Sequence, residues 1–142
     1  MGLDMSLYGE LFLFDMSSEQ IKIRHAMPEI DLSPKYVVFK AIYWRKANQI
    51  HRWFVENVQD GTDDCGTYNV TTEQLGALLQ IARIALDTRD PSILPTQEGF
   101  FFGNTDYDED YWKDIDYTVK SLEKILNDNT LRDLEFKYHS SW

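Results

Sequence analysis

The chain has 142 residues, of which 43% are hydrophobic and 14% aromatic, so we expect one folded domain over residues 1–142. The formal net charge of −10 disfavours direct binding to nucleic acids and to anionic membranes. The single cysteine excludes an internal disulfide framework, and no apolar run approaches the ~20 residues of a membrane span.

The N-terminal third predicts two strands with an irregular segment between them. Residues 3–14 alternate apolar and polar side chains, a period typical of a half-buried strand, and Gly9 within them indicates a bulge or a close backbone approach. Residues 15–34 hold two prolines and are expected to be irregular, although Gln20–Arg24 could form a short strand. Residues 36–44 are β-branched and aromatic and predict the second strand.

The middle of the chain predicts two helices. Residues 45–58 repeat apolar side chains at helical spacing, and Gly61 is placed to end that helix. A short strand is expected at Thr67–Val70. Thr71 and Gln74 then match a capping box in front of a second helix with a broad apolar stripe.

The C-terminal third predicts a loop, a helix and a strand. The aromatic run at residues 100–102 is bracketed by glycines and predicts either a short buried strand or a loop that plugs the core. A third helix is expected to begin near Thr105 or Asp106, and a final strand at Leu134–Tyr138. Together the elements predict a single α+β domain, with a small mixed or antiparallel sheet and three main helices packed on it.

Several long motifs resemble a family of small phage- and prophage-encoded proteins. The motifs are MGLDMSLY at residues 1–8, YWRKANQIHRWFV at 43–55, NVQDG with DDC at 57–65, and LPTQEGFFFGNT at 94–105. The resemblance covers most of the chain except residues 15–35 and those after 127, and it carries no reaction and no catalytic residues. It implies a bacteriophage or prophage source and the cytoplasm of the host cell. Small accessory proteins of this class usually act on host machinery or host defence by binding.

Charge is unevenly distributed along the chain. Residues 22–52 carry seven basic and two acidic side chains, whereas residues 53–142 carry seven basic and eighteen acidic ones. Three interpretations stay open: the two regions neutralise each other, the basic stretch holds a phosphate or carboxylate, or the acidic face binds a protein partner.

The basic stretch supplies the first candidate site. A helix N-terminus with adjacent cations can hold an anion, and an aromatic ring beside cations can stack on a nucleobase. Arg45 and Arg52 are seven residues apart and are expected on one helix face, and polar residues around the aromatic run could line a pocket. Ordinary packing of these side chains is the alternative. The residues predicted to bind a ligand are Arg45, Lys46, His51, Arg52, Trp53 and Gln97.

The start of the third helix supplies the second candidate site. The acidic residues predicted to bind a partner are Asp106, Asp108, Glu109 and Asp110. The same carboxylates would suit the positive end of a helix dipole.

A third hypothesis pairs His51 with Asp63 or Asp64 as acid and base, with Arg45 stabilising charge. No spacing matches a metal motif, so neither a metal nor a cofactor is expected.

These observations favour a non-enzymatic phage accessory protein. It would bind and inhibit a host protein, for example in counter-defence or host takeover, or sequester a small anionic signalling molecule. The alternative is a small enzyme that uses His51 with Asp63 or Asp64 on a nucleotide or phosphoester. The aromatic share of the sequence would permit a homodimer interface without locating one.

Overall fold

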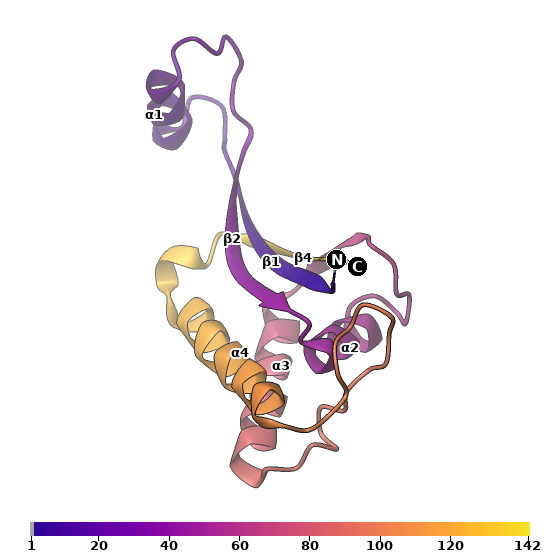
Figure 1. The fold of residues 1–142 in the computed structure, drawn as a ribbon. Helices are drawn as coiled ribbons and strands as arrows, with labels where there is room; N and C mark the ends of the chain where they lie inside the picture. Colours follow the sequence, from indigo (N-terminus) through magenta and orange to yellow (C-terminus); the bar gives the residue numbers. More distant parts are fainter. Residues whose placement is uncertain (1) are drawn as a thin grey trace.

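The computed structural model describes residues 2–142 and shows an α+β fold built on one four-stranded antiparallel sheet (Figure 1). In chain order the elements are β1 (Asp4–Phe12), α1 (Ser18–Ala26), β2 (Tyr36–Arg45), α2 (Asn48–Asn57), β3 (Thr67–Val70), α3 (Thr72–Thr88), α4 (Glu109–Asn127), a 3-10 helix at Asn129–Leu131, and β4 (Glu135–Ser141). The strand order is β2-β1-β4-β3, so the last strand lies between the first and the third. The predicted α+β class and the antiparallel alternative are confirmed.

One face of the sheet forms the core. Met5 and Leu7 of β1 are fully buried, and Leu7 faces Ile42 of β2 on one side and Tyr138 of β4 on the other. The helices α2, α3 and α4 cover this face (Figure 1), and the ring of Phe54 in α2 stacks on Tyr138 at 3.9 Å between centroids. These are the three helices that the apolar stripes predicted. The period of two in β1 therefore sets which side of the sheet receives helices.

The structure corrects the prediction of a strand at Gln20–Arg24, because these residues lie in α1. The side-chain hydroxyl of Ser17 caps this helix by accepting from the backbone N–H of Gln20 at 3.2 Å, and Glu19 lies favourably in its first turn. Gln20 is the only buried residue of α1. The helix has no apolar face, so periodicity could not reveal it.

Two helix starts are also corrected. β2 continues through Arg45 and α2 begins at Asn48, so Arg45 and Arg52 do not share a helix face. α4 begins at Glu109, because the Asp108 carboxylate accepts from the first free backbone N–H groups of the helix. The expected start at Thr105 or Asp106 was therefore three to four residues too early.

Other local predictions agree with the structure. The strand at Thr67–Val70 and the capping box of Thr71 and Gln74 are confirmed. The aromatic run is a loop, in which Phe102 plugs the core while Phe100 is 94% exposed. The sequence predicted a bulge or a close backbone approach at Gly9. The register of β1 against β2 shifts between Leu7 and Tyr8, just before Gly9, and a Cβ on Gly9 would lie 2.7 Å from a side-chain atom of Leu134.

A projecting arm extends from the sheet. We define the arm as residues 12–39, which comprise the end of β1, α1, the following loop and the start of β2. Figure 1 shows that it stands away from the rest of the molecule, which we call the body. None of the residues of α1 belongs to the hydrophobic core that the described residues form. The arm therefore contributes little to the core.

Candidate functional site

The loop between α3 and α4 is held against the start of α2 by the side chain of Asn48. This amide is 1% exposed, and its Nδ2 donates to the carbonyl oxygens of Phe102 at 3.1 Å and Asn104 at 2.8 Å. Its Oδ1 accepts from the backbone N–H of Gln97 at 3.0 Å. Loss of any of these bonds would leave a buried polar group unpaired, so Asn48 fixes the path of the loop.

A pocket of about 380 Å³ lies between this loop, the junction of β2 and α2, and the first turns of α4. Its charged lining residues are Arg45, Lys46, Asp106, Asp108, Asp110, Lys113 and Asp114. We call it the charged pocket. The sequence treated the basic pair Arg45 and Lys46 and the acidic start of α4 as separate candidate sites. The structure brings them together in one cavity.

Lys46 is positioned on the basic side of the pocket by a tight backbone approach. A Cβ on Gly103 would lie 3.2 Å from Cβ of Lys46, and Gly103 has a φ of +89°, which favours glycine. Arg45 Nη1 donates to Asp4 of the neighbouring strand at 3.1 Å, yet the arginine side chain stays 53% exposed. The ion pairs formed within residues 2–142 include none with Lys46.

Asp114 stands on the acidic side. Burial raises the pKa of its carboxyl to about 6; a hydrogen bond with Gln49 opposes this shift, and the charges of Asp110 and Asp108 add to it. Lys113 pairs with Asp110 at 3.0 Å, whereas no ion pair of the described chain includes Asp114. Asp114 was not among the site residues predicted from the sequence. The available signal was its spacing of four residues from Asp110, which places both on one helix face.

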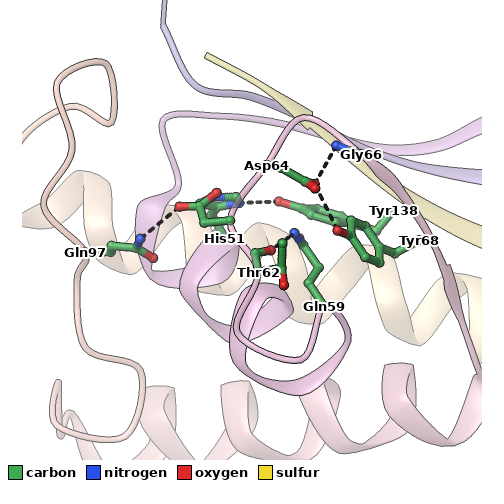
Figure 2. Close-up of polar contacts among 9 residues, drawn as sticks. His51, Gln59, Thr62, Asp64, Gly66, Tyr68, Gln97 and Tyr138 are labelled. Carbon is green, nitrogen blue, oxygen red and sulfur yellow. Dashed lines mark hydrogen bonds and ion pairs between the residues drawn. The ribbon is translucent and has the colours of Figure 1, made fainter.

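The predicted contact between His51 and Asp63 is present, and Figure 2 shows the side chain of His51 between those of Gln97 and Tyr138. His51 is 0% exposed; its Nε2 lies 3.0 Å from Asp63 Oδ1 and its Nδ1 lies 2.7 Å from the hydroxyl of Tyr138. Gln97 Nε2 donates to the other Asp63 oxygen at 3.2 Å. Burial lowers the pKa of His51 more than Asp63 raises it, and burial keeps the pKa of Tyr138 far above its usual value.

These pKa directions assign the donors in the network. Tyr138 keeps its proton and donates to Nδ1, so the neutral ring of His51 donates from Nε2 to Asp63. Both ring nitrogens are thereby occupied, and none is free for a substrate. Asp64 instead accepts from the backbone N–H of Gly66 and from the hydroxyl of Tyr68 (Figure 2). The arrangement joins α2, the loop after it and β4.

The other predicted ligand residues lie outside the charged pocket. Arg52 pairs with Glu56 at 2.8 Å and donates to the carbonyl oxygen of Thr96 at 3.3 Å, so it supports the loop. Trp53 is 6% exposed and packs edge-on against Phe54. Of the acidic residues, Glu109 is absent from the pocket lining. The pocket thus contains two of the six predicted ligand residues and three of the four predicted acidic residues.

Replacing Asn48 with alanine is expected to loosen the loop. The change leaves two carbonyl oxygens and one N–H without their partner, which should cost about 2–3 kcal/mol of unfolding free energy. Hydrogen exchange should accelerate at the amides of residues 97–104. The control Asn69→Ala alters an exposed amide on β3 and should leave exchange in this loop unchanged. Unchanged protection of the loop in Asn48→Ala would contradict the anchoring role.

Comparisons of the chain with known protein families, with curated proteins and with solved structures gave no match. The resemblance to phage proteins therefore stays a prediction. Within residues 2–142, no group of three or more His, Cys, Asp or Glu side chains could hold a metal ion. No helix in that range is long and apolar enough to cross a membrane.

Proposed function

We propose that this protein binds a small zwitterionic molecule in the charged pocket and acts by sequestering it. The supporting observation is that two opposite charges line the same cavity and form no ion pair within residues 2–142: Lys46 at the junction of β2 and α2, and Asp114 on α4. A carboxylate or phosphate of the ligand would lie against Arg45 and Lys46, and an ammonium group against Asp114. The volume of about 380 Å³ lies within the range of small-molecule sites, roughly 300–1,000 Å³.

The lining disfavours a ligand that carries negative charge alone. Four carboxylates and three cations line the cavity, so an anion without a cationic group would meet uncompensated repulsion from the α4 side. The sequence led us to expect a small anionic signalling molecule; the charged pocket favours an anion that also carries an amine. Binding without turnover is favoured because His51 and Asp63 do not line this pocket.

The resemblance to phage proteins supplies a setting for this activity. Sequestration in the host cytoplasm would lower the free concentration of a small molecule on which host defence depends. Inhibition of a host protein through the acidic residues at the start of α4 is the second hypothesis. Three of its four carboxylates line the charged pocket, so a basic partner would compete with the ligand.

Titration calorimetry with matched probes tests the proposal. O-phosphoethanolamine and β-alanine carry both charges, whereas inorganic phosphate and ethylamine each carry one sign. We expect at least one zwitterion to bind at least tenfold more tightly than either single-sign probe at the same ionic strength. Phosphate that binds as tightly as O-phosphoethanolamine would indicate a simple anion site and contradict the proposal.

A pair of lysine variants locates the binding. Lys46→Ala removes the free cation of the pocket and should weaken zwitterion binding about tenfold, because a charge-assisted contact contributes about 1.5 kcal/mol. Lys120→Ala removes an equal charge from the outer face of α4, where it pairs with Asp116, and should leave affinity unchanged. Equal effects of both changes would show that only the overall field matters.

A further inference from the structure

The arm carries most of the exposed apolar surface of the molecule. Residues 2–142 expose fifteen large hydrophobic side chains, and ten of these lie in the arm. Phe14 is 72% exposed, Met16 79% and Leu32 75%. The exposed fractions in the arm amount to about five and a half whole side chains, or roughly 1,000 Å². The largest single apolar patch of a typical monomeric protein covers roughly 300–600 Å², so the arm as a whole holds more exposed apolar area than one such patch.

The arm also carries little of the net negative charge of the chain. Its residues include four acidic and three basic side chains, for a net charge of −1 out of −10. Nearly all of the negative charge is therefore on the body. Two bodies repel each other, whereas an arm approaches another copy with little electrostatic cost.

A groove at the base of the arm continues this apolar surface. It has a volume of about 1110 Å³ and runs between the β1–β2 ribbon and the C-terminal half of α4. Phe14 and Phe39 line it from the arm, and Ile125 and Leu131 line it from the body. We define the tip of the arm as residues 20–38. None of these residues lines the groove, so the tip does not fill the groove of its own chain.

We propose that two copies of this chain form a twofold dimer in which the tip of each arm fills the groove of the partner. A twofold contact needs a self-complementary patch, and the contiguous arm and groove provide one. Burial of most of the exposed arm in both copies would remove roughly 1,500–2,000 Å² from water, within the range of stable interfaces. Lys22 and Arg24 on the arm would approach Asp133 and Glu135 of the partner's groove, whose other charged lining residues are Glu19 and Lys124.

Sedimentation analysis of the full chain tests the dimer. We expect the wild type to sediment at twice the monomer mass at micromolar concentration. Leu32→Asp places a charge at the tip of the arm and should give a monomer with an unchanged circular dichroism spectrum and unchanged zwitterion binding. The control Phe100→Asp alters a side chain that is 94% exposed on the α3–α4 loop, and it should remain a dimer. A monomeric wild type at 100 µM overturns the proposal, as does a dimeric Leu32→Asp.

Disulfide trapping tests which surface holds the tip. Because Cys65 is free and exposed, it is first replaced by serine. Leu32→Cys at the tip and Ser121→Cys in the groove are then prepared separately, mixed and oxidised. We expect a mixed disulfide between the two variants, since a tip in the groove can bring the two Cβ atoms to the ~4 Å that the bond needs. Disulfides formed only between Leu32→Cys chains would show arm-to-arm packing and overturn the proposed geometry. A wild type that is monomeric and binds a host protein through the arm overturns the choice of a second copy.

Discussion

Replacement of His51 with alanine is expected to lower the unfolding free energy by about 3–5 kcal/mol. The imidazole is fully buried, packs edge-on against Phe102 at 5.1 Å between centroids, and bonds through both ring nitrogens. Its removal opens a cavity and leaves the buried hydroxyl of Tyr138 without an acceptor. Chemical denaturation monitored by tryptophan fluorescence measures the change.

Two comparison variants divide this effect into its parts. Tyr138→Phe removes only the hydroxyl and should cost about 1–2 kcal/mol, because the neutral ring of His51 then lacks its donor. His25→Ala alters an exposed histidine of α1 and should change stability by less than about 0.5 kcal/mol. If His51→Ala were as stable as the wild type and lost an enzymatic turnover, the acid–base hypothesis would replace the structural role described above.

Asp114→Asn is expected to stabilise the fold at pH 7 while weakening zwitterion binding about tenfold. The folded-state pKa of about 6 lies above the ordinary value of 3.8, so the native state holds this proton more tightly than the unfolded chain does. Stability therefore falls as pH rises from about 4 to 6, and the full cost is present at pH 7. Asparagine avoids this cost, and after discounting for partial solvent exposure we expect a gain of about 1–2 kcal/mol.

The same carboxylate predicts how binding depends on pH. Only the ionised form attracts an ammonium group, so wild-type affinity for β-alanine, whose own carboxyl and amino groups do not titrate in this range, should rise roughly tenfold between pH 5 and pH 7. Tyr43 and Asp4 raise the pKa of Arg45, and Asp110 raises the pKa of Lys113, so both stay charged over this range. The rise therefore reports on the acidic side of the pocket, where Asp106, Asp108 and Asp110 also lie. In Asp114→Asn the rise should be lost.

Asp116→Asn is the matched control for both measurements. Asp116 lies two residues further along α4, outside the charged pocket, and pairs with Lys120. The change should alter stability by less than about 0.5 kcal/mol and leave the pH dependence of binding intact. A stabilised Asp114→Asn variant that still binds with normal affinity would show that Asp114 takes no part in binding, and the proposed function would fail.

Local sequence signals were sufficient where a segment carries its own pattern. The alternation of β1 and the capping box of α3 each depend on neighbouring residues, so the sequence alone predicts them. The start of α4 was misplaced because several aspartates in a row can cap a helix. Asp108 is the aspartate that caps α4. Its position depends on the loop before the helix, in which the carbonyl of Asn104 accepts a hydrogen bond from Asn48.

Local sequence signals could not predict contacts between residues that are far apart in the sequence. His51 and Tyr138 are 87 residues apart, and they meet because β4 inserts between β1 and β3 beneath α2. The charged pocket likewise draws on the end of β2, the α3–α4 loop and the start of α4. By itself the sequence determined the fold class, the strand faces and the separate basic and acidic segments, because those follow from local pattern and composition. Only the tertiary structure placed the two charged segments in one cavity, because that depends on the order of the strands in the sheet. Only the tertiary structure showed that the apolar side chains of the arm stay exposed, because that depends on where the helices stop covering the sheet.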